Sequence, residues 1–255
     1  MYWSSLRVVF PRWEAANPGA ALRVGTELFE HSPALSVESG RPAEISTPHG
    51  KILADHVFIA TNAHTPRLGF FRSSIFPVHQ YSLATRKLTQ QEITGFGLDR
   101  WMMRFESNIL PVTFSLTPGG HFFLRMVLGY ASFNSCEWND IEGARNLARR
   151  IFEQRYPRIA DIELAHGWHG VTGHTVLFRQ IAGVVGDGNI HISAAYNGLG
   201  IMPGHNNGYL TACQITGHTD EDTRYLTGVS GQMPLPGEFY RSLMLKPFMR
   251  LMTPV

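Results

Sequence analysis

Short apolar runs predict strands in the first third of the chain. They lie at 28–30, 34–38 and 57–60, and a polar stretch ending in Thr47-Pro48-His49-Gly50 separates the last two. Short runs bounded by turn residues are typical of a small antiparallel sheet, and the run at 57–60 is apolar enough for a buried strand. The polar residues and proline of 61–66 then indicate a turn into a short helix or loop.

A second group of strands follows in the middle of the chain. Apolar positions at 78–88, 110–116 and 121–130 fit extended segments, and Thr117-Pro118-Gly119-Gly120 has the composition of a turn between the last two. This pattern predicts an antiparallel sheet.

Helical spacing begins near residue 139. Asn139 is a suitable N-cap, and Glu142 lies three residues further on, where its side chain can reach back to the cap. The apolar residues that follow share one face, and Pro157 ends the helix after about Tyr156. A strand from Ile162 to Trp168 is predicted next.

The most informative stretch runs from Ile190 to Gly204. Its first residues alternate as in a buried strand, glycines at 198 and 200 let the backbone approach a ligand, and Pro203 suits a first helical turn. The helix is predicted to continue to about Ile215 and to end near Gly217. Its N-terminal amides would stabilise negative charge on a ligand, although the same pattern also occurs in ordinary strand-to-helix connections.

Composition sets the general class of protein. The chain has 255 residues, of which 44% are hydrophobic and 16% charged, so it can bury the core of one large domain or two small ones. A formal charge of +2 without a dense Lys/Arg run argues against a nucleic-acid partner.

The two cysteines, Cys136 and Cys213, form no CxxC pair or disulfide framework, which favours a reducing cytoplasm. There is no apolar run of about 18 residues and no signal-peptide pattern. We therefore expect a soluble, cytoplasmic protein without a membrane span. The apolar, partly basic tail at 233–255 raises a membrane-surface alternative, but packing on the body of the protein is the favoured interpretation.

Several familiar catalytic motifs are missing. His166, His169 and His174 lack the spacing of a zinc site, and in a strand the first two would point to opposite faces, so we expect no metal. No GxSxG elbow is present, and the dinucleotide fingerprint GxGxxG is absent as well.

Four stretches carry a family resemblance. They are Gly25–Ala34, Ala54–Ala63, Trp168-His169-Gly170 and Ala195–Ile201, in that order. The chain resembles FAD-dependent oxidoreductases of the D-amino-acid oxidase/glycine oxidase superfamily, and most closely their γ-glutamylputrescine oxidoreductase-like members. In that family the stretch that corresponds to 25–34 lines the adenosine end of the cofactor, and the one that corresponds to 54–63 is a strand approaching the dinucleotide. The stretch at 168–170 corresponds to a W-x-G motif near the flavin, and 195–201 to the closing glycine turn at the flavin ring.

The resemblance implies an FAD cofactor and an α+β fold. A truncated FAD-binding domain with a partial Rossmann-like sheet, at 1–76 and 159–232, would be interrupted by an antiparallel-sheet substrate domain at 77–158, with a tail at 233–255. The family's glycine-rich βαβ unit would precede Met1, which accounts for the absent fingerprint. The cofactor-binding residues implied are Ala34, Thr61, Asn62, Ala63, Trp168, Gly170, Gly198, Leu199, Gly200 and Ile201.

The implied reaction is hydride transfer from the carbon next to an amine nitrogen to flavin N5. Amino-acid oxidising relatives often place an Arg for the substrate carboxylate after W-x-G, whereas this chain has Val171-Thr172 there. An amine or polyamine derivative is therefore the favoured substrate. Arg125 is a candidate replacement anchor, with a surface or interdomain salt bridge as the alternative role. Tyr196 and His169 are candidate substrate contacts, with packing the favoured role for both, and no catalytic base is assigned.

A rival hypothesis is a non-catalytic remnant or binding module on the same scaffold that cannot retain FAD. Either protein would expose the edges of incomplete sheets. We therefore expect self-association, or a partner chain that covers these edges.

Overall fold

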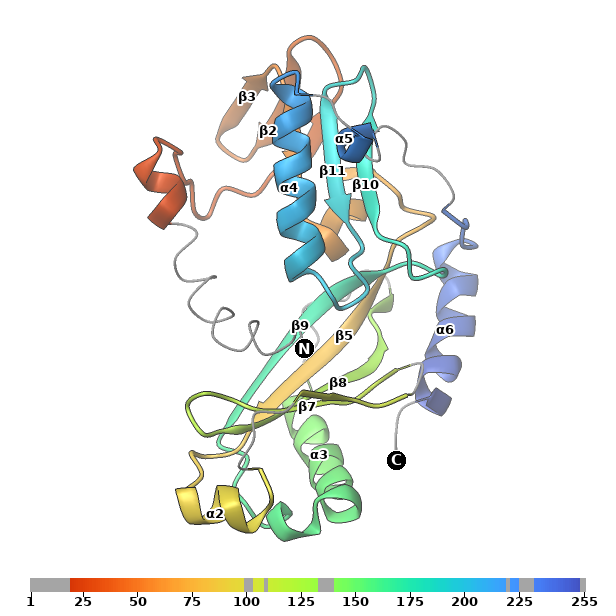
Figure 1. Cartoon of the computed structure of the whole chain (residues 1–255). Coiled ribbons are helices and arrows are strands. Elements are labelled where there is room, and N and C mark those ends of the chain that lie inside the picture. Colours follow the sequence, from red (N-terminus) through yellow and green to blue (C-terminus); the bar gives the residue numbers. More distant parts are fainter. Residues whose placement is uncertain are drawn as a thin grey trace.

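Two nine-residue strands, β5 (Phe76–Ala84) and β9 (His166–His174), pair antiparallel along their whole length. They belong to a five-stranded sheet, the large sheet, in the order β6 (Met103–Phe105), β7 (Thr113–Leu116), β8 (Phe122–Tyr130), β5, β9. The computed structural model describes residues 19–98, 103–107, 110–132, 140–218, 221–224 and 232–252. Within these ranges, β5 and β9 run from the upper part of the molecule down to α3 (Ile141–Arg155) (Figure 1).

Helix α3 covers one face of the large sheet. Its buried residues recur at helical spacing and pack against β5 and β8 in one apolar core. The helix begins where the Asp140 carboxylate accepts a hydrogen bond from the amide of Gly143 at 2.9 Å, and the 3₁₀ turn η3 (Pro157–Ile159) follows its end. The inward-facing residues of α3 are Ala144, Leu147, Ala148, Ile151 and Phe152.

A second, three-stranded sheet lies above the large sheet. In this mixed sheet, β11 (Ile190–Ala194) pairs antiparallel with β10 (Ile181–Val185) and parallel with β4 (Val57–Ile59). Alternate residues of β11 join an apolar core, and α4 (Ile201–Ile215) lies alongside the strand (Figure 1). Within the described ranges β4 is an edge strand, and its Phe58 is 40% exposed.

The remaining elements are short or peripheral. An antiparallel hairpin sheet contains β1 (Ser36–Glu38), β2 (Ala43–Thr47) and β3 (Gly50–Ala54). The 3₁₀ helix η1 (Asn62–Leu68) follows β4, α2 (Gln90–Gly95) follows β5, and α5 (Glu221–Arg224) follows α4. Helix α6 (Glu238–Met252) packs on the large sheet beside β8, as we expected for the tail. None of the helices described is long and apolar enough to cross a membrane.

The prediction of a mixed α and β protein is confirmed, as are the strands at β4, β8 and β11, the turn at 117–120 and the helix ending at Ile215. Residues 28–30 form no strand, and the hairpin β2–β3 was missed. The strand predicted at 162–168 instead begins at His166 and continues to His174. Asp140 is the cap of α3, while the predicted cap, Asn139, and Cys136 lie outside the described residues.

Candidate flavin site

The ends of two parallel strands meet at the predicted ligand turn. Strands β4 and β11 are parallel, so their carboxyl ends lie at the same edge of the mixed sheet, where ligands of open α/β sheets usually bind. After β4, the Asn62 side-chain oxygen accepts a hydrogen bond from the amide of Ala195, which follows β11, at 3.0 Å. Both residues have positive φ, 46° and 56°, so this contact holds two turns in an uncommon backbone conformation.

The end of β9 joins the same junction through Asn197. Its amide donates to the Gly173 carbonyl at 3.1 Å, and its side-chain oxygen accepts from the amide of Thr175 at 2.9 Å. A Cβ on Gly173 would lie 2.9 Å from the Asn62 side-chain oxygen, a separation real Cβ atoms essentially never show. The absence of a side chain on Gly173 therefore lets the large sheet approach the turn after β4.

The N-terminus of α4 opens at this junction. Gly198 has φ +84°, and Gly200 is the N-cap, with no side chain capping the helix and no acidic residue in its first turn. First-turn amides have no acceptor within their own helix, so those of Ile201 and Met202 can donate to a ligand atom that carries negative charge. Leu199 is 57% exposed beside them. This uncapped end fits the N1 and C2=O edge of a flavin ring.

Arg125 connects the large sheet to the same turn. Its guanidinium donates through Nη1 to the Gly198 carbonyl at 2.8 Å and through Nη2 to the Thr113 hydroxyl at 3.4 Å. Desolvation by burial lowers the pKa of Arg125. Among the described residues no carboxylate forms an ion pair with it, so the salt bridge considered as its alternative role is not present there.

Trp168 lies on the same face of the large sheet as Arg125. Ser82 of β5 is the register partner of both Arg125 and Trp168, and partners across a sheet point to the same side. Trp168 stacks on Phe123 with ring centroids 5.7 Å apart, yet it remains 51% exposed. The exposed indole forms an aromatic wall on the arginine side of the sheet.

Gln80 is a site residue that sequence reasoning missed. It is the register partner of Gly170, and a Cβ on Gly198 would lie 3.1 Å from its side-chain nitrogen. All nine residues of β5 are buried, so the sequence of this strand did not reveal which face meets the turn. Side chains of a strand alternate between the two faces of the sheet, so Gln80 and Ser82, two residues apart, lie on the same face.

His169 points to the opposite face, toward α3. It lies across from Tyr81, with ring centroids 4.8 Å apart, and the Tyr81 hydroxyl accepts a hydrogen bond from the amide of Asp140 at the start of α3. His169 Nε2 lies 2.8 Å from His79 Nδ1. Burial, together with the His169 ring, lowers the pKa of His79 to about 4, and burial also lowers that of His169. The structure thus separates His169 from Trp168 and Gly170.

Tyr196 folds back over the start of α4. Its hydroxyl lies 2.7 Å from the hydroxyl of Ser193, which also accepts from the Asn207 side-chain nitrogen at 2.9 Å. A Cβ on Gly200 would lie 3.1 Å from the Tyr196 ring. Burial raises the pKa of Tyr196. The hydroxyl is thus held inside the layer between β11 and α4.

The other predicted residues are spread around the junction. Ala63 is buried beside Gly173, the Thr61 hydroxyl lies 3.0 Å from that of Thr65, and Ala34 lies in the exposed segment before β1. The structure therefore brings Asn62 and Ala63 together with residues 195–197, directly before the turn 198–201, and Gln80 connects Gly198 to Gly170. In the ranges the structure describes, no three His, Cys, Asp or Glu side chains form a group that could hold a metal.

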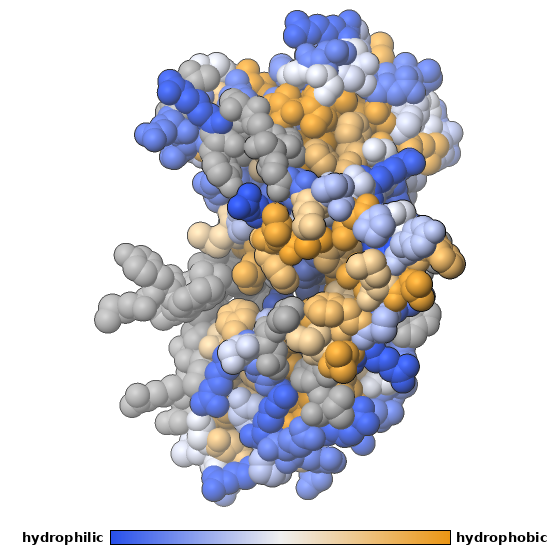
Figure 2. All heavy atoms as spheres, turned by 90° about the vertical axis from the view of Figure 1, so that its right-hand side faces the viewer, coloured by the Kyte–Doolittle hydropathy of each residue, from blue (hydrophilic) through white to orange (hydrophobic). Residues whose placement is uncertain are grey.

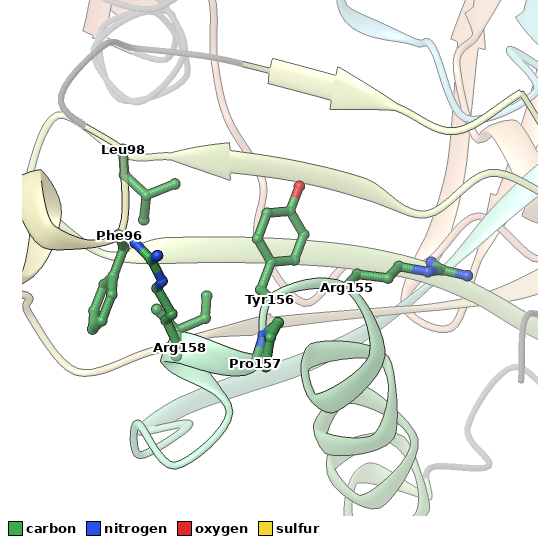
Figure 3. Close-up of a pocket in the computed structure, with 7 residues that line it drawn as sticks. Phe96, Leu98, Arg155, Tyr156, Pro157 and Arg158 are labelled. Carbon is green, nitrogen blue, oxygen red and sulfur yellow. The ribbon is translucent and has the colours of Figure 1, made fainter.

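A pocket of about 220 Å³ lies elsewhere, between α2 and the end of α3 (Figure 3). Its walls include Phe96, Leu98 and Tyr156, and its arginines are held by the protein: Arg155 pairs with Glu106, and Arg158 donates to the Gly95 carbonyl at 3.1 Å. Figure 3 shows Arg155 pointing away from Arg158, so the two do not form a joint anion site.

An α+β chain with a ligand turn at the carboxyl ends of parallel strands is consistent with a nucleotide-cofactor enzyme. Residues 15–214 match the DAO family model, described as FAD-dependent oxidoreductase. The chain belongs to this family, whose cofactor is FAD.

Individual relatives agree with the family match. The chain is similar to a probable oxidoreductase, OrdL, of Rhizobium meliloti (strain 1021), with 28% identity over 211 residues, which cover 79% of this chain and 45% of the relative. Its fold is similar to that of glycine oxidase from Geobacillus kaustophilus, with a TM-score of 0.68 and 18% identity. The match covers 84% of this chain and 56% of the glycine oxidase chain. Iminodiacetate oxidase from Chelativorans sp. BNC1 gives a TM-score of 0.59 and 17% identity, over 77% of this chain and 53% of the iminodiacetate oxidase chain. The chain thus spans about half the length of the relatives it matches.

Proposed function

We propose that this chain forms the flavin-ring and substrate side of an FAD-dependent amine oxidoreductase. The single observation that carries the proposal is the junction of Asn62, Ala195 and Asn197 beside the uncapped start of α4. Bound FAD would accept a hydride at N5 from the carbon next to an amine nitrogen. The substrate leaves as an imine, which water hydrolyses to a carbonyl compound and an amine, and oxygen or another acceptor takes the two electrons.

The chain's own groups would supply placement and electrostatics. The amides of Ile201 and Met202 would donate to the ring edge where negative charge develops, and the fixed turn would hold them in position before the reaction. Gln80 and the buried hydroxyl of Ser82 would line the polar floor of the site, with Trp168 as its aromatic wall. Tyr196 keeps the helix start rigid through Ser193 and Asn207.

Arg125 favours a substrate with an anionic group. Among the described residues, this partly buried guanidinium donates to one carbonyl and one hydroxyl, which leaves several N–H groups for an oxyanion, and Arg geometry suits a carboxylate. We therefore propose an amine or polyamine derivative that carries a carboxylate, such as a γ-glutamylputrescine-like compound. The names of glycine oxidase and iminodiacetate oxidase, two structural neighbours, also refer to amines that bear carboxylates.

The division into domains is also part of the proposal. Cofactor segments at 1–76 and 159–232 would flank a substrate domain at 77–158, which shares its sheet with β9, and a tail at 233–255 would follow. A glycine-rich phosphate-binding segment would complete the site, either in the same polypeptide or in a partner chain, by pairing with the edge of β4 that no other described strand occupies. We propose a cytoplasmic location from the cysteine usage.

Anaerobic reduction tests this function. Protein loaded with FAD is mixed with γ-glutamylputrescine and, as a matched control, with putrescine, which lacks the carboxylate. The proposal predicts loss of the flavin absorbance near 450 nm and release of a carbonyl product, faster with the carboxylated amine. Failure of amines of both kinds to reduce bound flavin would contradict the proposed reaction, and failure of the chain to retain FAD would favour the rival hypothesis of a non-catalytic remnant or binding module.

A further inference from the structure

Helix α6 is apolar on two sides. Its inner side, which includes Met249, packs against β8 in a core with Phe76 and Val78. The outer face of α6, as we call it, consists of six large apolar residues that are between 45% and 83% exposed. They are Phe239, Tyr240, Leu243, Met244, Phe248 and Leu251.

The inner contacts hold the helix without help from the outer face. The guanidinium of Arg241, 6% exposed, donates to the carbonyls of Arg72 at 2.9 Å, Pro236 at 3.2 Å and Ile75 at 3.3 Å. The Glu238 carboxylate accepts the Tyr130 hydroxyl hydrogen bond at 2.7 Å. The outer face is therefore not needed to fix α6 on the body and is available for another contact.

The outer face lies in an apolar part of the molecular surface. Figure 2 shows hydrophobic side chains gathered on the side of the molecule where α6 lies, among more hydrophilic surroundings. Contiguous apolar patches of this kind mark surfaces that bind a partner or a membrane. The helix lies beyond residues 15–214 that match the family model.

The charges on α6 favour a lipid surface. Lys246 and Arg250 are exposed one turn apart, on the same side of the helix as Leu243. Neither forms an ion pair with a described residue. The one acidic residue of the helix, Glu238, is bound to Tyr130 on the inner side. Apolar side chains bordered by basic ones are typical of helices that lie in the interface of anionic membranes.

A second copy of the chain fits this face less well. In a two-fold pair of α6 helices, Lys246 and Arg250 of both copies would border the same interface, and Glu238, the acidic residue of the helix, lies on the inner side where it cannot pair with them. We propose that the outer face of α6 binds the surface of membranes rich in anionic lipid, with the apolar residues entering the headgroup region and Lys246 and Arg250 contacting phosphates.

Vesicle co-sedimentation tests the proposal on the full chain. Phosphatidylcholine vesicles are compared with vesicles in which about one third of the lipid is phosphatidylglycerol, and we expect about tenfold more bound protein on the anionic vesicles. The double variant Phe248→Ser/Leu251→Ser should lose binding to both. The variant Lys246→Glu/Arg250→Glu should lose the preference for anionic lipid. Ile52→Ser/Leu53→Ser, which changes exposed residues of β3, is the matched control and should bind as wild type.

Circular dichroism and melting curves identify variants that fail to fold, and sedimentation velocity reports the oligomeric state. Absence of wild-type protein from the anionic-vesicle pellet would overturn the proposal. Loss of vesicle binding in Ile52→Ser/Leu53→Ser equal to that in Phe248→Ser/Leu251→Ser would also overturn the proposal. A dimer that Phe248→Ser/Leu251→Ser converts to monomer, without vesicle binding, would instead identify a second copy as the occupant.

Discussion

The side-chain oxygen of Asn62 accepts a hydrogen bond from the amide of Ala195 at 3.0 Å, across 133 residues of sequence. This bond ties the turn after β4 to the turn after β11, and Gly173 of β9 packs against the same asparagine. The bond therefore joins two turns of the mixed sheet at the proposed flavin ring, and the large sheet packs directly against it.

Replacing Asn62 should reveal the strength of this contact. Asn62→Ala leaves the amide of the fully buried Ala195 without its hydrogen-bond acceptor. It also places alanine at φ 46°, a backbone conformation that asparagine tolerates better. We therefore expect a loss of about 1–3 kcal/mol in the free energy of unfolding. Asn62→Gly loses the same hydrogen bond but tolerates positive φ, and should be less destabilised. Urea unfolding measures both. Equal stability of Asn62→Ala and wild type would contradict the account.

Two glycines of β9 offer a matched pair. In Gly173→Ala the new methyl group would lie 2.9 Å from the Asn62 side chain and 3.1 Å from the Ala63 amide nitrogen, whereas in Gly170→Ala it would meet nothing within 4 Å. We expect Gly173→Ala to lower the melting temperature by several degrees and to weaken FAD binding. Gly170→Ala should melt within a degree or two of wild type. Similar behaviour of the two variants would argue against close packing of β9 on η1.

Arg125→Met tests the proposed substrate anchor. Methionine roughly preserves the apolar stem and removes a partly buried charge that has no carboxylate partner among the described residues, so we expect a small change in stability. For a carboxylated amine, KM should rise about 10- to 100-fold, while for an uncharged amine it should stay nearly constant. Arg125→Lys should recover part of the difference. An equal rise in KM for both amines would rule out the anchor.

Buried histidines should make stability depend on pH. Burial, and secondarily the charge of Arg125, lowers the pKa of His174 to about 4 from its ordinary 6.5. The unfolded chain therefore binds more protons between pH 6.5 and 4, so stability is full above pH 6.5 and is lost as pH falls to about 4. His174→Gln should flatten this dependence in urea titrations at several pH values. The exposed His49→Gln is the control and should leave the slope unchanged.

The sequence allowed prediction of the elements whose periodicity is strong. Alternating apolar residues identified β11, and helical spacing with a late glycine identified α4. Strand β9 was displaced in the prediction because its sequence, HGWHGVTGH, contains three glycines and little apolar alternation. The hairpin β2–β3 was missed because its strands include Glu44, Ser46 and Lys51, which are unlike a buried run.

The candidate site was only partly accessible from the sequence. Its glycine turn was identified from local composition, but the contact between Asn62 and Ala195 depends on the parallel pairing of β4 with β11, a long-range feature. The orientation of His169 depends on the register between β5 and β9, which also reveals Gln80. The pairing of β4 with β11 and the register of β5 with β9 both join segments far apart in the sequence, so residues close to Asn62 or His169 in the chain do not determine them.

The most direct measurement is a titration of the purified chain with FAD, followed by the change in flavin fluorescence, with Gly198→Val as the comparison. A branched residue at φ +84° would be strained, and its Cβ would meet the Gln80 side chain at 3.1 Å, which distorts the turn at the ring. The wild-type chain should take up FAD saturably, and the folded variant should bind FAD at least about tenfold more weakly. A wild-type chain that takes up no FAD, or a folded Gly198→Val chain that binds FAD as tightly as wild type, would contradict the proposed flavin site.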